Sequence, residues 1–213
     1  MIITYMGLQA FKIQFGDMTI AINPASKESK QKSARFGADI ALISLNDVDM
    51  NGADTVAHGD RKPFTITGPG EYEIKGVFVK GFKSVSHYGG STEDRINTIY
   101  TITLEGMHLC FLGALDTKEL SPEAKEALDD IDVLFVPIAG EGVLAPALAY
   151  ELAVKLSPRL IIPIQFADTS DKNLKVFLKE AGEEGRKPED KLTLKKKDLE
   201  GKEGEVVVLT PQA

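Results

Sequence analysis

Residues 38–50 read Ala-Asp-Ile-Ala-Leu-Ile-Ser-Leu-Asn-Asp-Val-Asp-Met, an apolar segment that runs into a polar one. A continuous apolar run such as residues 39–44, bounded by polar residues, favours a strand that is covered on both faces. The segment that follows it, residues 45–50, is the loop at the end of this strand. We therefore expect functional side chains, if the protein has them, to begin in this loop.

The segments before residue 38 predict short strands separated by turns. Apolar residues alternate with polar ones over residues 11–15 and 18–22, and Gly16-Asp17 between them predicts a hairpin. An earlier strand is predicted at residues 2–5. Residues 27–35 form a basic, polar connection, for which a solvated loop is the expected structure, so no function is assigned to it.

The segments after residue 50 continue with β-like pieces, most of them followed or preceded by glycine. Glu105-Gly106 predicts a hairpin between the last two of these pieces. The predicted strands lie at residues 64–67, 71–74, 77–79, 98–104 and 107–112.

Helical spacing appears only in the second half of the chain. Ser121-Pro122 is typical of a helix start, and Pro146 opens a second helix with Leu148, Leu152 and Leu156 on one face. Further elements are a strand at 132–137, a strand at 160–164, a helix carrying 174–181, and strands at 192–194 and 205–209. Amphipathic helices need an apolar sheet face to cover, so this order predicts an α/β (α+β) fold, a four-layer αββα sandwich forming a single domain over residues 1–213.

The composition describes a soluble globular chain. Of 213 residues, 43% are hydrophobic and 27% are charged, and the formal net charge is −7. The acidic balance without a basic stripe gives no indication of a nucleic-acid partner, and no apolar run approaches the length of a membrane span. A single cysteine, Cys110, and a start without a secretory signal favour the cytoplasm. The partner, a small molecule or a protein, and the oligomeric state are not specified by these properties.

Several stretches resemble, in order, the landmarks of the small metallo-β-lactamase-like, zinc-dependent hydrolases, and the resemblance covers most of the chain. The opening stretches are Thr4-Tyr5-Met6-Gly7, Ile20-Ala21-Ile22-Asn23-Pro24 and Ala38-Asp39-Ile40-Ala41-Leu42-Ile43-Ser44. The later stretches are residues 68–76, 97–100, 111–113, 131–137 and 162–164. The resemblance implies the metallo-β-lactamase fold and, in its intact form, a site for one or two zinc ions.

The resemblance also implies a metal-binding motif, H-x-H-x-D-H, directly after the strand that ends at Ser44. Here Leu45 stands at the first histidine, Asp47 at the second, Asp49 at the aspartate and Met50 at the last histidine. Leucine offers no donor atom, and a methionine thioether is a soft ligand that suits copper(I) better than zinc. Two of the four positions therefore keep a side chain suited to zinc.

Three further ligand positions are implied by the resemblance. His87 stands at one of them and keeps its imidazole. Ala114 replaces the bridging aspartate, although Asp116 lies two residues away, and Gln165 replaces the final histidine. Leu45, Met50, Ala114 and Gln165 are thus degenerate ligand positions, and Asp47, Asp49 and His87 are the residual ones.

Two hypotheses follow for the activity. The first is a non-catalytic binding or structural protein with this fold and no cofactor, since a catalytic zinc needs about three protein ligands to lower the pKa of its bound water. The second is a metal-dependent hydrolase with a ligand set rebuilt from Asp47, Asp49, His87 and Asp116, holding zinc or another divalent cation such as Mg²⁺ or Mn²⁺. We favour the first and name no substrate.

Other reactive residues have simpler explanations. Cys110 lies in an apolar run and is expected to be a buried structural thiol. His58 is expected in a turn and His108 on a solvated strand face. The segment 68–71 lacks the lysine and the helix of a phosphate loop, so a tight turn is predicted. Asp47 and Asp49, two residues apart in a loop, equally fit a turn or a helix cap.

Overall fold

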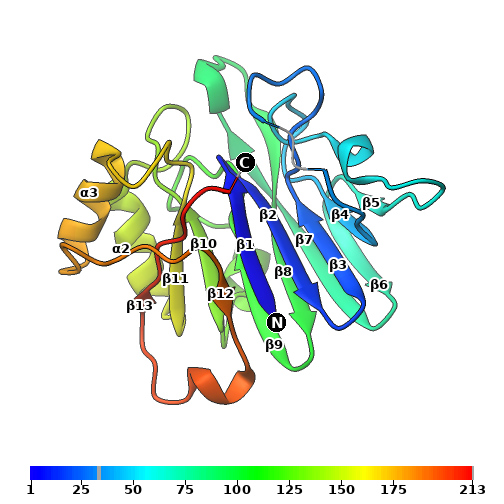
Figure 1. The fold of residues 1–213 in the computed structure, drawn as a ribbon. Helices are drawn as coiled ribbons and strands as arrows, with labels where there is room; N and C mark the ends of the chain where they lie inside the picture. The colour runs from blue at the N-terminus through cyan, green and yellow to red at the C-terminus, as the bar shows by residue number, and fades with distance from the viewer. Residues whose placement is uncertain (33–34, 213) are drawn as a thin grey trace.

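The computed structural model describes residues 1–32 and 35–212 (Figure 1). Two β-sheets pack against each other, and side chains from both sheets form one continuous core. The aromatic rings of Phe11 from the first sheet and Phe135 from the second lie 4.8 Å apart, and Phe111 packs edge-on against Phe11 at 6.4 Å. The prediction of two packed β layers with helices outside them is confirmed.

The first sheet has six strands in the order β12-β1-β2-β3-β4-β5. Their bounds are Leu192–Thr193, Ile2–Gly7, Ala10–Phe15, Met18–Ile22, Ile40–Leu42 and Phe64–Ile66. The pairs from β12 to β3 are antiparallel, whereas β3, β4 and β5 run parallel. The strand that the sequence placed at residues 39–44 is β4, and all three of its residues are buried.

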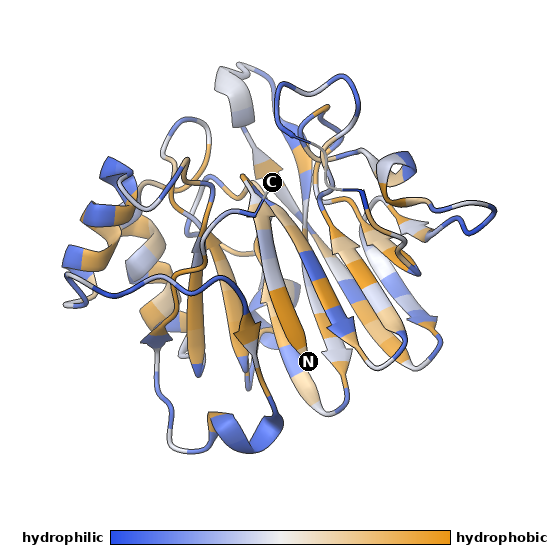
Figure 2. Ribbon diagram, in the orientation of Figure 1, coloured by the Kyte–Doolittle hydropathy of each residue, from blue (hydrophilic) through white to orange (hydrophobic). Residues whose placement is uncertain are grey.

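The second sheet has seven strands in the order β13-β11-β10-β9-β8-β7-β6. Their bounds are Glu205–Val206, Leu160–Ile164, Val133–Pro137, Met107–Phe111, Arg95–Leu104, Val77–Ser86 and Gly70–Ile74. β9, β10, β11 and β13 are parallel, and the others pair antiparallel. Figure 2 shows β10 and β11 as almost continuously apolar and β2 as alternating, in line with the burial of every residue of β10 and β11.

The three α-helices among the described residues are α1 (Pro122–Ala127), α2 (Pro146–Leu156) and α3 (Lys172–Glu180). α2 packs against β10 of the second sheet, and α3 packs against α2 (Figure 1). Ser121 caps α1 as predicted, its side chain accepting a hydrogen bond from the backbone N–H of Ala124. The outer face of the first sheet is covered differently. There Ala21 and Ala41 pack against Val56 of the one-turn 3₁₀ helix η1 (Ala53–Val56).

One predicted core position is wrong. Leu148 was expected to share the buried face of α2 with Leu152, yet it is 41% exposed. The buried face of α2 is formed instead by Ala149, Leu152 and Ala153. This face is rotated by about one residue relative to the predicted one. In the described part of the chain, no helix has both the length and the apolar character that crossing a membrane requires.

Candidate functional site

Loops at the carboxyl ends of parallel strands meet at one edge of the two sheets. The loop after β4 contains Leu45, the loop after β9 contains Ala114, and the residue directly after β11 is Gln165. The backbone N–H of Ala114 donates to Asn97 Oδ1 at 2.9 Å, and Leu45 forms a β-bridge with the same Asn97. In open α/β sheets this edge is where ligands bind.

A small apolar cluster fills the point where these loops meet. Leu45, Met50 and Ala114 are all buried and pack together with Val143, while Tyr88 and Ala139 pack against them from the side. The structure thus brings together three of the positions that the sequence comparison identified as degenerate. Their side chains contact one another and offer no nitrogen or oxygen donor at this point.

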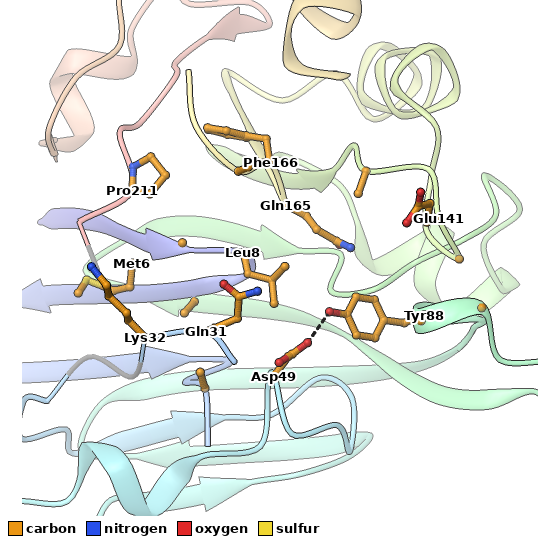
Figure 3. Close-up of a pocket in the computed structure, with 18 residues that line it drawn as sticks. Met6, Leu8, Gln31, Lys32, Asp49, Tyr88, Glu141, Gln165, Phe166 and Pro211 are labelled. Atoms are coloured by element: carbon orange, nitrogen blue, oxygen red, sulfur yellow. Dashed lines mark hydrogen bonds between the residues drawn. The ribbon is translucent and has the colours of Figure 1, made fainter. Parts of the chain in front are cut away.

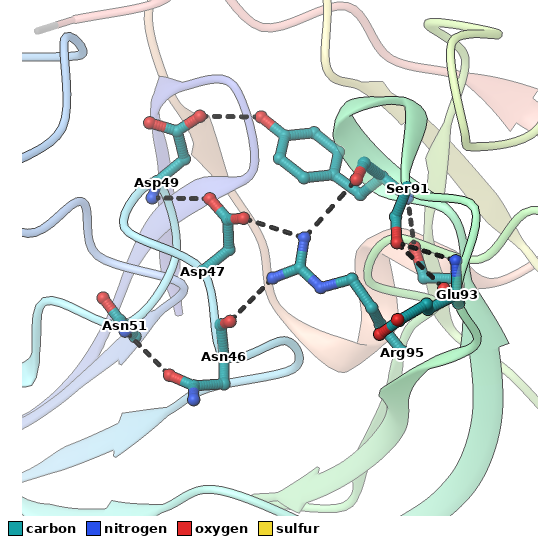
Figure 4. A network of polar contacts seen from close by, with 9 residues as sticks. Asn46, Asp47, Asp49, Asn51, Ser91, Glu93 and Arg95 are labelled. Atoms are coloured by element: carbon teal, nitrogen blue, oxygen red, sulfur yellow. Dashed lines mark hydrogen bonds and ion pairs between the residues drawn. The ribbon is translucent and has the colours of Figure 1, made fainter.

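Asp47 is held by an arginine. Its carboxylate forms an ion pair with Arg95 Nη1 at 2.9 Å, and Arg95 Nη2 donates to the backbone oxygen of Asn46 at 2.7 Å (Figure 4). Asp47 Oδ1 also accepts the backbone N–H of Asp49 at 3.1 Å, a turn that the two-residue spacing predicted. Arg95, at the start of β8, therefore neutralises this carboxylate.

Asp49 is held by two hydroxyl groups. Tyr88 Oη donates to Asp49 Oδ2 at 2.8 Å, and Ser29 Oγ donates to Asp49 Oδ1. Burial, together with the neighbouring carboxylate of Asp49, raises the pKa of the Tyr88 hydroxyl above its usual value, so this group stays protonated and remains the donor. Figure 4 shows Asp47 and Asp49 facing different partners.

His87 lies outside this loop and pairs with two acidic residues. Its Nδ1 contacts Asp116, and its Nε2 lies 3.2 Å from Asp94 Oδ1. The hydrogen bond with Asp116, aided by the charges of Asp116 and Asp94, raises the pKa of the imidazole above its ordinary value. Asp116 therefore lies beside His87, and the two side chains bind each other.

Within residues 1–32 and 35–212, no three or more His, Cys, Asp or Glu side chains are grouped so that they could hold a metal ion. Among the candidate ligands, the structure joins Asp47 to Asp49 through the turn and His87 to Asp116. His58 lies in a turn with Arg61 and His108 is exposed, as predicted. Burial raises the pKa of the Cys110 thiol, so this group is an unreactive part of the core.

Gln165 belongs to a chain of buried amides. Its side-chain oxygen accepts from Gln9 Nε2 at 2.6 Å, and Gln9 Oε1 accepts from Asn23 Nδ2 at 3.1 Å. The backbone N–H of Gln165 donates to the oxygen of Leu8 at 2.6 Å and to Tyr5 Oη at 3.1 Å. These bonds hold Gln165 at a φ of 67°, a left-handed conformation that is uncommon for a residue with a side chain.

A cavity of about 860 Å³ is lined by Gln165, at the end of the amide chain, and by Tyr88 and Ala139, which pack against the apolar cluster (Figure 3). Its walls are mostly apolar, with Leu8 and Phe166 among them, and Tyr88 and Asp49 close one side. The charged groups that line it are Lys32, Asp49 and Glu141. An apolar cavity with a few convergent polar groups is typical of a binding site for a small molecule.

A model of the β-lactamase superfamily domain matches residues 2–165 of the chain. The protein belongs to the β-lactamase superfamily. A search of curated protein sequences found no match for this superfamily member.

Solved structures of candidate or established metal-dependent hydrolases have a similar fold. A candidate zinc-dependent hydrolase of the metallo-β-lactamase superfamily from Thermotoga maritima is 27% identical, with a TM-score of 0.75 over 98% of this chain and 97% of the other. A candidate metal-dependent hydrolase from Parabacteroides distasonis is 18% identical, with a TM-score of 0.68 over 99% and 93%. A metallohydrolase from Ignicoccus hospitalis is 20% identical, with a TM-score of 0.61 over 91% and 99%.

The zinc that the superfamily implies does not fit the residues of this member. Zinc prefers thiolate, imidazole and carboxylate ligands, and the site presents Leu45, Met50 and Ala114 in contact with one another instead. The Gln165 oxygen, the weak donor at the fourth degenerate position, is already bonded to Gln9. No chemical step is therefore assigned to a metal here.

Sequence reasoning missed the partners of the candidate ligands. Arg95 and Tyr88, which hold Asp47 and Asp49, are ordinary residues in sequence and carry no motif. Gln31 and Lys32, in the connection to which no function was assigned, line the cavity. The basic composition of this connection was the only signal in the sequence, and the placement of Gln31 and Lys32 at the cavity depends on the folded chain.

Proposed function

We propose that this member of the β-lactamase superfamily is a binding protein that works without a metal and uses the cavity beside Gln165 to hold its ligand. The observation that carries the proposal is the apolar cluster of Leu45, Met50, Ala114 and Val143. It occupies the place where the resemblance implies metal ligands. An apolar cluster stabilises the loops that surround the cavity, so the fold keeps its pocket while the hydrolytic chemistry is lost.

The contacts of the residual ligand positions support the same proposal. Asp47 is neutralised by Arg95, and both oxygens of Asp49 accept hydroxyl hydrogen bonds. A carboxylate that is paired in this way binds a cation less favourably, because the existing partner must be displaced first. The second hypothesis, a hydrolase rebuilt from Asp47, Asp49, His87 and Asp116, requires these pairs to break.

We further expect a cytoplasmic location. The support is the single cysteine, Cys110, which is buried and has no partner for a disulfide.

The deciding experiment is elemental analysis of tag-free protein after incubation with zinc, manganese and iron and then desalting. We expect far less than one metal per chain. Near-stoichiometric metal that disappears in both Asp47→Ala and His87→Ala would overturn the proposal and establish the rebuilt hydrolase. Asp17→Ala, in the exposed turn between β2 and β3, is the matched control and should behave as the unmodified protein.

A further inference from the structure

The direction of the hydrogen bonds in the amide chain is set at Ser44. Its backbone N–H donates to Asn23 Oδ1 at 2.8 Å, and a backbone N–H has no other role than donor. The other end of the Asn23 amide is therefore Nδ2, which donates to Ser44 Oγ at 2.8 Å and to Gln9 Oε1 at 3.1 Å. Asn23 is fully buried, so water does not compete for these contacts.

The same direction passes along the chain to Gln165. Because Gln9 accepts through Oε1, its Nε2 is the end that donates to Gln165 Oε1 at 2.6 Å. The remaining atom of the Gln165 amide is Nε2. A primary amide nitrogen carries two protons and can only donate.

Gln165 Nε2 faces the cavity. The residue is only 7% exposed and lines the cavity, and Figure 3 shows its amide end directed toward the side where Tyr88 lies. Among the residues that the structure describes, none accepts a hydrogen bond from this nitrogen. A donor of fixed direction in the wall of a cavity can give its proton to an acceptor that binds there, whereas it offers nothing to a second donor.

We propose that the cavity binds a neutral carboxamide, whose carbonyl oxygen accepts from Gln165 Nε2. This rests on the proposed function, a binding cavity without a metal. Two carboxylates, Asp49 and Glu141, and one ammonium group, Lys32, line the cavity, so a negatively charged acceptor is disfavoured. The Tyr88 hydroxyl gives its only proton to Asp49, and its oxygen is left to accept from the N–H of the same carboxamide.

The test is a titration followed by NMR on the side-chain NH₂ signals of Gln165, which are assigned by their loss in Gln165→Glu. The probes are benzamide, benzoate and aniline, which share a ring and differ in the polar group. We expect benzamide to shift the Gln165 signals and to bind at least about tenfold more tightly than benzoate or aniline, the ratio that one well-placed hydrogen bond provides. No shift at Gln165, or equal affinity for the three probes, would overturn the inference.

Gln165→Glu replaces the donor by a carboxylate and should weaken benzamide binding at least about tenfold. The matched control is Gln14→Glu, which makes the same change of charge on β2, outside the lining of the cavity, and should change the affinity less than about twofold. Equal losses in the two variants would show a general effect of charge and would contradict the role given to Gln165.

Asn23→Asp tests the direction of the chain. An aspartate accepts from Ser44 but has no proton for Gln9, so both glutamine amides should rotate and present Gln165 Oε1 to the cavity. We expect the preference of benzamide over aniline to be lost, because both probes carry an N–H donor that can bind Gln165 Oε1. If this variant fails to fold, the comparison of Gln165→Glu with Gln14→Glu decides alone. Metal uptake by the unmodified protein would contradict the proposed function, whereas a failed benzamide titration without metal uptake contradicts only this inference.

Discussion

Leu45 shows at the scale of one residue how the site differs from a metal centre. Its side chain is 2% exposed and contacts Met50, Ala114 and Val143. Full burial of a leucine stabilises a protein by about 1.5 to 3 kcal/mol, whereas a buried polar group without a partner costs about 1 to 3 kcal/mol. A histidine at this position would lose the first contribution and add the second.

Leu45→His should therefore lower the free energy of unfolding by about 3 kcal/mol, with or without zinc, because no other ligands stand beside it. The control is Val48→His in the same loop, where the side chain is 42% exposed and the change should stay within about 0.5 kcal/mol. Urea unfolding measures both. Rescue of Leu45→His by zinc would show that a usable ligand set is present after all.

The environment of His87 changes a quantity that can be measured, the pKa of its imidazole. Because Asp116 raises the pKa of the imidazole in the folded state, the pairing stabilises the fold below about pH 6.5, the ordinary value, and this contribution is lost as the pH rises through the raised pKa. NMR titration of His87 should show the raised value. Asp116→Asn should bring it back toward the ordinary one, and an unchanged pKa in that variant would contradict the assignment.

The residues of the site could be predicted only in part. The turn at Asp47 follows from the local spacing of two aspartates, and the burial of Cys110 follows from its apolar neighbours. The partners do not follow, because Tyr88 lies 39 positions from Asp49 and Arg95 lies 49 from Asn46. The amide chain joins Gln9 to Gln165, which are 156 positions apart.

At the scale of elements, apolar patterns predicted strands well where both faces are covered and less well at their ends. β7 was expected over residues 77–79 but runs over Val77–Ser86, because its polar residues, Lys80 and Lys83, point to solvent while its pairing with β8 continues. β13 is shorter than expected, Glu205–Val206, although the N–H of Val207 still donates to Ile161 at 2.9 Å. The ends of these strands are set by backbone pairing, which the pattern of apolar and polar residues does not reveal.

Leu148 lies on the exposed face of α2 and Leu152 on its buried face. Leu152→Ala should lower the free energy of unfolding by about 2 to 5 kcal/mol, because Leu152 is 1% exposed and its loss leaves a cavity against β10. Leu148→Ala makes the same chemical change on the exposed face and should stay within about 0.5 kcal/mol. Similar losses in the two variants, measured by urea unfolding, would show that α2 packs in a different orientation.

At the scale of the whole molecule, the core between the two sheets holds the fold and the loops at one edge hold the site. Phe11, Phe111 and Phe135 join the sheets without any contribution from the candidate ligands. The order of strands and helices was predictable, since each element carries its own apolar pattern. The 3₁₀ helix η1, which packs on the outer face of the first sheet, was not predictable, because a single 3₁₀ turn has no periodicity to detect.

A core that is independent of the site should unfold at the same temperature with and without metal. An ion present at 100 times its dissociation constant would stabilise the native state by about 2.7 kcal/mol, which for a chain of this size raises the melting temperature by roughly 5 to 10 °C. We expect the shift between EDTA and excess zinc to be under about 1 °C. A rise of several degrees with zinc would point to a bound ion.

The apolar cluster of Leu45, Met50, Ala114 and Val143 also bears on how such a chain can change over generations. A single histidine or aspartate introduced at one of these positions would be buried without partners, and the variant would be less stable. A set of metal ligands would form only when several such residues were introduced together. Selection for stability therefore opposes each single substitution toward a metal site, and under the proposed function we expect related chains to diversify around the cavity.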